Sequence, residues 1–362
     1  MQPESEEDYM QDVTRRQVVA SLTAALLYAS RSGAVEPGLA PAPTAGRTSI
    51  DESGFVPIGG IEQWIAIRGQ HAHNPVIIFL HGGPGDAQSP FLAEFAPWEK
   101  DFAVVTWDQR GSGKTYGRYG QETPGMATPA AAFERLIQDA IELTEYVRRR
   151  LRKERAVLIG HSVGSVLGLK VMHRRPDLFH AYVATGFPAS WPLVVHARET
   201  WIRGKARRAG DQRTLKALGA AARLPIGDLQ RFIVGQDYLM GPSDIEYLNI
   251  EGKFIGRPPA PTKGDVADWL GGFNFSQARV FPAVTSFVAR EFTLDIAVPF
   301  FVIQGRDDHV VSDAAAKAYV AAVRAPHKAF VAIDGGHFAC FMNPTEFVST
   351  LRKLVLGKPG LA

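Results

Sequence analysis

The sequence predicts an α/β protein built on a mostly parallel central sheet flanked by helices. Short runs that are apolar throughout recur along the 362-residue chain, at 76–80, 103–107, 156–159, 181–184, 300–303 and 329–333. Runs without polar alternation are typical of strands buried on both faces. Segments with helical periodicity separate several of these runs, and strands that alternate with helices indicate βαβ units in a parallel sheet.

Two elements frame this pattern. Strand-like segments at 54–58 and 61–68 flank Gly59-Gly60, which predicts a hairpin. Residues 130–152 carry apolar side chains near helical spacing and end in a basic cluster that opposes the negative end of a helix dipole. We therefore interpret the basic residues at 148–155 as the end of a helix and not as a binding patch.

The alternation stops between residues 187 and 297. This stretch contains a segment with helical character at 198–222 and turns rich in proline and glycine at 256–264. A mainly helical cap inserted into the sheet domain is the simplest explanation. The predicted organisation is a leader and linker at 1–47, a first part of the core at 48–186, the cap at 187–297 and a second part of the core at 298–362.

Composition excludes some classes of protein. Hydrophobic residues make up 46% of the chain and charged residues 21%, with 40 basic and 37 acidic side chains. This balance gives no support for a nucleic-acid partner. The single cysteine, Cys340, excludes an intramolecular disulfide framework and a cysteine-based metal site. The oligomeric state stays open.

The first 47 residues resemble a twin-arginine export signal. Arg15-Arg16 precede an apolar stretch that ends near Ala29, and small residues and prolines fill 33–46. The apolar stretch is shorter than the roughly 20 residues that span a bilayer, so we expect a removable signal and no stable membrane insertion. Export to the periplasm or the medium is the expectation; a disordered tail on a cytoplasmic enzyme is the alternative.

Residues 160–164 have the sequence Gly-His-Ser-Val-Gly directly after a predicted strand and before a helical segment. This strand–turn–helix context is what the G-x-S-x-G nucleophile elbow requires. Glycines on both sides remove side chains that would clash in the sharp turn. The pattern predicts Ser162 as a nucleophile, while His161 inside the elbow is expected to pack or orient.

Residues 81–85, His-Gly-Gly-Pro-Gly, follow another predicted strand. A tetrahedral intermediate needs backbone N–H groups aimed at its oxyanion, and glycines allow a close approach of the backbone. We predict that the N–H groups of Gly83 and Val163 form the oxyanion hole.

An acid and a base follow the nucleophile along the chain. Asp308 closes Gly305-Arg306-Asp307-Asp308 after a predicted strand, and His337 follows two glycines after the next one. The rivals are Asp307 for the acid and His309 for the base. The chain order Ser162, Asp308, His337 is the order that α/β-hydrolases use for their catalytic triad, so the predicted fold is the α/β-hydrolase fold with a helical cap.

Two patterns resemble other sites. Residues 111–115, Gly-Ser-Gly-Lys-Thr, look like a phosphate-binding loop, but Asp108 stands where the pattern needs glycine, and residues 116–124 are expected to form a loop. His71-x-His73 is a close histidine pair without an HExxH motif, so no metal site is predicted. We expect no cofactor.

HGGPG at 81–85, WDQRGSG at 107–113 and the elbow ending in Gly164-Ser165 resemble the prolyl iminopeptidase family of α/β-hydrolases. The resemblance covers about 54–186 and 298–356 and fades in the cap. It implies removal of an N-terminal residue, typically proline, from peptides or related amides. It also implies an acidic residue in the cap for the free amine of a short-peptide or small-molecule substrate. Glu199 is our first candidate, and the other acids that the cap offers are Asp237, Glu246 and Glu251.

The chain departs from the family at the elbow, where GHSVGS replaces GGSWGS. A carboxylic-ester hydrolase is therefore the alternative within enzymes. Dehalogenases and epoxide hydrolases have an aspartate at the position of Ser162, which disfavours both. A hydrolase fold retained as a non-catalytic binding protein is the alternative from another class.

Overall fold

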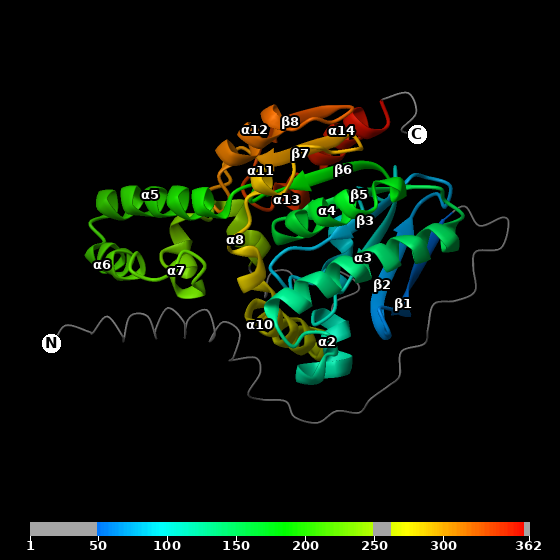
Figure 1. Ribbon diagram of the computed structural model, residues 1–362, viewed down its shortest axis with the longest axis horizontal. Helices are drawn as coiled ribbons and strands as arrows, with labels where there is room; N and C mark the ends of the chain where they lie inside the picture. Colours follow the sequence, from blue (N-terminus) through cyan, green and yellow to red (C-terminus); the bar gives the residue numbers. More distant parts are fainter. Residues whose placement is uncertain (1–48, 249–261, 358–362) are drawn as a thin grey trace.

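The structure, a computed structural model, describes residues 49–248 and 262–357. A sheet of eight strands forms its centre, in the order β1-β2-β4-β3-β5-β6-β7-β8 (Figure 1). The β1–β2 and β2–β4 pairs are antiparallel and all other pairs are parallel. The predicted mostly parallel sheet is confirmed.

The predicted strands are present; β3 and β4 have the predicted bounds, and the others are longer than predicted. They are β1 Ile50–Ile58, β2 Ile61–Gly69, β3 Val76–Leu80, β4 Ala103–Trp107, β5 Ala156–His161, β6 Phe179–Thr185, β7 Phe300–Gly305 and β8 Lys328–Ile333. Every residue of β3, β4 and β7 is buried, as expected of apolar runs without alternation. In the predicted hairpin, Gly59 (φ 60°) and Gly60 (φ 76°) supply the left-handed turn that suits the twist of two antiparallel strands.

Helices cover both faces of the sheet. One face packs against α3 (Pro129–Leu151), α4 (Val163–Arg174) and α12 (Asp313–Ala322). The other packs against the 3-10 helix η1 (Ser89–Phe95), α13 (Ala339–Met342) and α14 (Pro344–Val355). Successive side chains of a strand point to opposite faces, so Ile78 belongs to the first buried cluster and Ile77 to the second.

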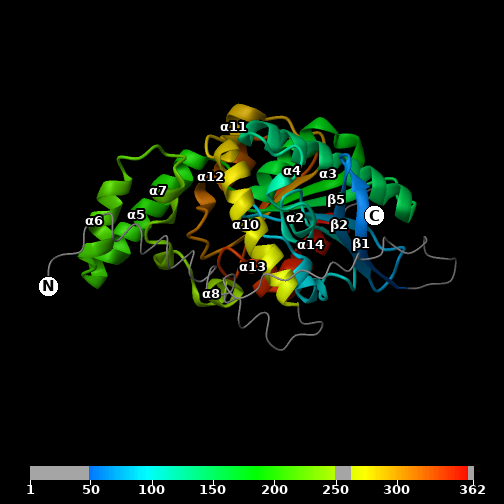
Figure 2. The same cartoon turned by 90° about the horizontal axis from the view of Figure 1, so that it is seen from below.

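Between β6 and β7 the described part of the chain contributes helices but no strand of the sheet. They are α5 Trp191–Ala209, α6 Gln212–Ala221, α7 Leu229–Ile233, η4 Gln236–Tyr238, α8 Pro242–Leu248, α10 Lys263–Val284 and α11 Ala289–Phe292. Helices α5, α6 and α7 project from one end of the sheet, whereas α10 lies beside α2 (Gly113–Tyr119) (Figures 1 and 2). A small cluster of buried residues, including Ile202, Leu218 and Val310, ties the projecting helices to the loop after β7.

Two details differ from the sequence-based expectation. The segment at 198–222 forms two helices, because Gly210 ends α5 in the left-handed region (φ 69°) and the Asp211 side chain caps α6 by accepting from the Thr214 N–H. The loop expected at 116–124 is wrong, since α2 and the short helix η2 (Gly120–Glu122) occupy most of it. The 3-10 helix η3 (Pro176–Leu178) directly precedes β6.

The predicted export signal at 1–47 lies outside the described residues and stays a prediction. Within the two described ranges, no helix combines the length and the apolar character needed to cross a membrane.

Candidate active site

Ser162 lies at the turn between β5 and α4 with backbone φ 52° and ψ −123°. A residue other than glycine at positive φ is strained, and such strain is typical of functional turns. The flanking glycines leave no room for side chains: a Cβ on Gly160 would collide with the backbone of Gly164, and a Cβ on Gly164 with the Leu80 carbonyl. The strand, turn and helix expected around Ser162 are therefore all present.

The loops after β7 and β8 bring Asp308 and His337 together. His337 Nδ1 lies 3.0 Å from Asp308 Oδ2. The Val311 N–H donates to Asp308 Oδ1 at 2.8 Å, and the Gln304 amide donates to Oδ2 at 3.3 Å. An imidazole that donates from Nδ1 to this fixed carboxylate leaves Nε2 free to accept a proton.

The rivals of these two residues contact other groups. The Asp307 side chain is exposed, and the Asp307 N–H donates to the Gly335 carbonyl at 2.9 Å. The His309 ring stacks on Trp201 with a centroid distance of 3.5 Å. Asp308 is thus the carboxylate that pairs with His337.

The surroundings of His337 raise its pKa. Burial lowers the pKa of His337, but the charge of Asp308 and its hydrogen bond outweigh burial, so the pKa lies above its ordinary value. A carboxylate beside an imidazole stabilises the imidazolium form that a general base passes through.

These side chains lie at one edge of the sheet. Ser162, Asp308 and His337 follow the carboxyl ends of β5, β7 and β8, which are parallel strands. Two glycines after neighbouring strands each lie against one of them: a Cβ on Gly82 would lie 2.8 Å from the Ser162 Cβ, and a Cβ on Gly186 would lie 2.8 Å from His337 Cε1. The edge therefore collects the predicted nucleophile and the acid–base pair.

His161 packs beside this cluster as a neutral ring. It is buried, its centroid lies 4.8 Å from that of His337, and it also contacts Phe338 and Phe341. Burial, and then the neighbouring His337 and His81, lower the pKa of His161 well below its ordinary value. A neutral ring of this kind packs against His337 without adding a charge beside it.

The predicted oxyanion loop lies against the elbow. Gly83 has φ 102°, a conformation that favours glycine, and the Gly83-Pro84 peptide is cis. Val163 is the first residue of α4, so its N–H has no partner within the helix. Assignment of the Gly83 and Val163 N–H groups to an oxyanion stays a prediction.

The WDQRGSG segment is hydrogen-bonded to the predicted oxyanion loop at His81. The Gln109 side chain donates to the His81 carbonyl at 3.1 Å, and the Gln109 N–H donates to His81 Nε2 at 3.3 Å. Burial lowers the pKa of His81 to about 4, so its ring stays neutral and Nε2 can accept. These contacts link the two motifs that carry the family resemblance.

Helix α10 clamps both motifs, which the sequence analysis did not foresee. Gln277 donates to the Pro84 carbonyl at 3.0 Å and Trp269 to the Ala87 carbonyl at 3.1 Å. A Cβ on Gly85 would lie 2.8 Å from the Phe273 Cα, and a Cβ on Gly272 would lie 2.8 Å from the Gly113 nitrogen. Part of the glycine content of the motifs therefore serves helix packing.

The segment that resembles a phosphate-binding loop holds a carboxylate instead. It does enter a helix, contrary to the expected loop, but Asp108 Oδ2 accepts the Lys114 N–H at 2.8 Å and the Ser89 hydroxyl at 2.5 Å. Burial raises the pKa of Asp108 to about 6, against these hydrogen bonds. Within the described ranges, no group of three or more His, Cys, Asp or Glu side chains could share a metal ion.

Glu199, the candidate for binding a substrate amine, has a partner among the helices between β6 and β7. Its carboxylate accepts from Arg231 Nε at 2.7 Å, and both side chains are mostly buried. Arg231 also donates to the Leu224 carbonyl at 2.9 Å. The contact links α5 to α7, and the role of Glu199 toward a substrate stays a prediction.

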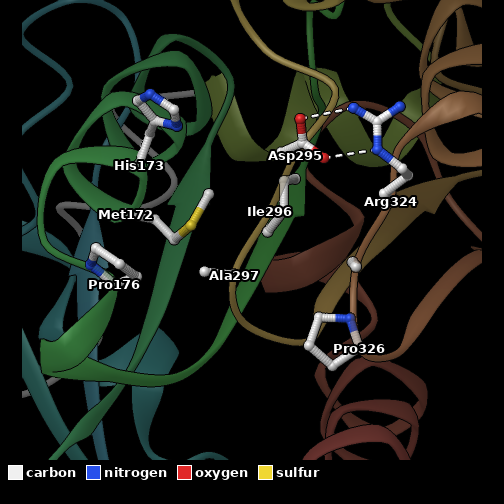
Figure 3. Close-up of a pocket in the computed structure, with 9 residues that line it drawn as sticks. Met172, His173, Pro176, Asp295, Ile296, Ala297, Arg324 and Pro326 are labelled. Carbon is white, nitrogen blue, oxygen red and sulfur yellow. Dashed lines mark hydrogen bonds and ion pairs between the residues drawn. The ribbon is translucent and has the colours of Figure 1, made fainter.

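A cavity of about 540 Å³ lies away from this cluster (Figure 3). Its lining includes Met172 and Pro176 before β6, Ile296 before β7 and Pro326 before β8, with the Asp295–Arg324 ion pair at one side. These positions precede the strands, so the cavity lies at the sheet edge opposite Ser162 and His337.

Comparison with known proteins agrees with this geometry. The chain belongs to the family described as alpha/beta hydrolase fold, which matches residues 75–344. The protein named Probable aminopeptidase YbaC of Bacillus subtilis is 27% identical over 310 residues, 82% of this chain and 93% of that protein. The Probable proline iminopeptidase of Leptolyngbya boryana is 28% identical over 35% of this chain and 36% of that protein.

The fold also matches solved structures. A proline iminopeptidase-related protein of Thermus thermophilus aligns with a TM-score of 0.59 and 21% identity, over 86% of this chain and 100% of that one. The resemblance to prolyl iminopeptidases and the α/β-hydrolase fold are therefore confirmed.

Proposed function

We propose that the protein is a serine hydrolase that cleaves a peptide or amide bond, acting as an aminopeptidase of the prolyl iminopeptidase type. The observation that carries the proposal is the strained Ser162 at the sheet edge where the His337–Asp308 pair also lies. The similarity to a protein named as a probable aminopeptidase along 82% of the chain supports the substrate class.

The proposed reaction has two steps. His337 accepts the proton of the Ser162 hydroxyl while that oxygen attacks the substrate carbonyl carbon, and the N–H groups of Gly83 and Val163 hold the resulting oxyanion. Collapse breaks the C–N bond, and the leaving amine takes the proton from His337. Water, deprotonated by His337, then attacks the acyl ester on Ser162. The bond between the acyl carbon and the Ser162 oxygen breaks, His337 returns the proton to that oxygen, and the acid is released.

Rates on matched substrates test the proposal. The wild type and Ser162→Ala are compared on proline and alanine arylamides, on their N-acylated forms and on a short-chain aryl ester. We expect cleavage of the free-amine amides and a loss of about 10⁴-fold or more in kcat for the variant. An unchanged rate in Ser162→Ala would exclude the serine mechanism.

A carboxylic-ester hydrolase is the second candidate, and one contact favours it. Glu199, the cap acid expected to meet a free amine, is already paired with Arg231. Cleavage of the ester alone, lost in Ser162→Ala, would keep the nucleophile and replace the aminopeptidase assignment.

A further inference from the structure

The buried carboxylate of Asp244, on cap helix α8, lies against the loop that carries His337. Asp244 has 0% of its surface exposed. Its Oδ1 accepts the Phe338 N–H at 3.1 Å, and its Oδ2 accepts the Gly241 N–H at 3.3 Å. One hydrogen bond thus holds the residue directly after His337, and the other holds the start of α8.

The residue directly before His337 touches the same carboxylate. A Cβ on Gly336 would collide with both oxygens of Asp244. Glycine at 336 is what allows the carboxylate to approach the backbone so closely. Asp244 therefore contacts the chain on both sides of His337.

The same helix makes a second contact with this region. The Tyr247 ring stacks on Phe338 with a centroid distance of 4.0 Å and an interplanar angle of 13°, and on Phe341 at 5.2 Å and 16°. Tyr247 is itself buried. Helix α8 thus packs on the loop after β8 and on α13 through an apolar ring and a carboxylate.

We propose that Asp244 is a positioning residue for His337, a role that rests on the proposed serine-hydrolase function. Its hydrogen bond to the Phe338 N–H fixes the loop that carries the imidazole. Its negative charge acts with that of Asp308 to favour the imidazolium formed when His337 takes the serine proton. A residue of the cap thereby completes the catalytic base of the core.

The charged groups around His337 determine the direction in which its pKa changes when Asp244 is replaced. Burial and Arg198 of α5 lower the pKa of His337, Asp308 and Asp244 raise it, and His161 faces it as a neutral ring. Removal of the Asp244 charge therefore lowers the pKa of His337. Because the neutral imidazole is the active base, activity then persists to lower pH.

Two variants separate the hydrogen bond from the charge. Asp244→Asn keeps an oxygen that can accept the Phe338 N–H but removes the charge, whereas Asp244→Ala removes both. The matched control is Glu246→Gln, which removes an exposed carboxylate from the same helix. Each protein is assayed for kcat and KM, and for the pH dependence of Ser162 inactivation by a fluorophosphonate, which needs no knowledge of the natural substrate.

For Asp244→Asn we expect most of the wild-type kcat and an acid limb of the inactivation profile displaced to lower pH. For Asp244→Ala we expect a decrease of about tenfold to a hundredfold in kcat with little change in KM, because the base is misplaced and not lost. Glu246→Gln should follow the wild type in the pH dependence of inactivation by the fluorophosphonate, which involves no substrate amine. Circular dichroism and thermal unfolding show whether each variant is folded.

If the acid limb of Asp244→Asn coincides with that of the wild type, the electrostatic role of Asp244 is wrong. If Asp244→Ala retains the wild-type kcat, its positioning role is wrong. If Asp244→Ala does not fold, Asp244→Asn decides the charge, and Asp244→Ser, whose shortened side chain carries no carboxylate, takes the place of Asp244→Ala with the same expected loss of kcat. A wild-type protein whose Ser162 fails to react with the phosphonate contradicts the proposed function instead, so the two failures are distinguishable.

Discussion

At the scale of single residues, Asp308 determines which ring nitrogen of His337 carries the proton. Its carboxylate is held by the Val311 N–H and the Gln304 amide, and it meets Nδ1 of the imidazole at 3.0 Å. This arrangement leaves Nε2 as the acceptor that a general base needs. The neighbouring Asp307 is exposed and offers a control of the same type one residue away.

We expect Asp308→Asn to decrease kcat by about 10³- to 10⁴-fold, because an amide that donates to Nδ1 stabilises the wrong tautomer of the imidazole. Asp307→Asn should retain the wild-type kcat within a factor of about two, since it changes an exposed side chain. Steady-state kinetics on the best substrate of the wild type measures both. Equal losses in the two variants would contradict the role of Asp308.

The sequence could predict those site residues whose neighbours along the chain form a recognisable pattern. Ser162 needs glycines on both sides, Asp308 follows the buried strand β7, and His337 follows the apolar but half-buried end strand β8, so the sequence pointed to all three. Asp244 and Gln277 act on backbone groups of residues far away in the sequence, Phe338 and Pro84. No spacing along the chain records such contacts, so they needed the structure.

At the scale of elements, a buried ion pair joins the loop after β4 to helix α3. Arg110 Nε donates to Asp139 Oδ2 at 2.6 Å, and the two side chains are 1% and 0% exposed. The same guanidinium donates to the carbonyls of Gly59 at 2.7 Å and Pro124 at 2.9 Å. Four segments of the chain therefore depend on one side chain of the WDQRGSG motif.

We expect Arg110→Met to lower the free energy of unfolding by about 3 kcal/mol, because Asp139 is left buried without its main partner. Arg174→Met, which breaks an ion pair between side chains 41% and 52% exposed, should cost at most about 1 kcal/mol. Urea unfolding followed by tryptophan fluorescence compares them. Equal costs would show that burial of the Arg110–Asp139 pair has no special effect.

Element boundaries show where sequence reasoning stops. The start of α2 was missed because its first turn is capped by Asp108, a side chain upstream of the helix that also binds Ser89. The break between α5 and α6 was missed although Gly210 and Asp211 are ordinary stop and start signals. The start of α2 therefore depends on a tertiary contact, whereas the break between α5 and α6 follows from ordinary local signals.

At the scale of the whole molecule, the strand order could not be derived from the apolar runs alone. These runs predict buried parallel strands, but they do not say that β4 lies between β2 and β3. The order of Ser162, Asp308 and His337 along the chain predicted the α/β-hydrolase fold, which is confirmed. The strand order within the sheet came from the structure, because it depends on pairings between strands that are far apart in the sequence.

Acid stability is a property of the whole molecule to which His81 contributes. Its Nε2 accepts the Gln109 N–H, and its Nδ1 lies 3.0 Å from the Gly82 carbonyl, so the folded site holds a neutral ring. Burial lowers the pKa from 6.5 in the unfolded chain to about 4. Between these values the unfolded chain binds a proton that the folded protein refuses, so this contribution is present above pH 6.5 and is lost as the pH falls toward 4.

We expect the wild type to lose about 2 kcal/mol more of its free energy of unfolding between about pH 7 and pH 5 than His81→Gln, in which the amide can donate and accept but does not titrate. Asp108, whose pKa burial raises to about 6, changes stability in the opposite direction over this range. It is present in both proteins, so the difference between them isolates His81. Urea unfolding of both proteins at the two pH values gives the comparison, and equal losses would mean that the ring is protonated in the folded state at the lower pH.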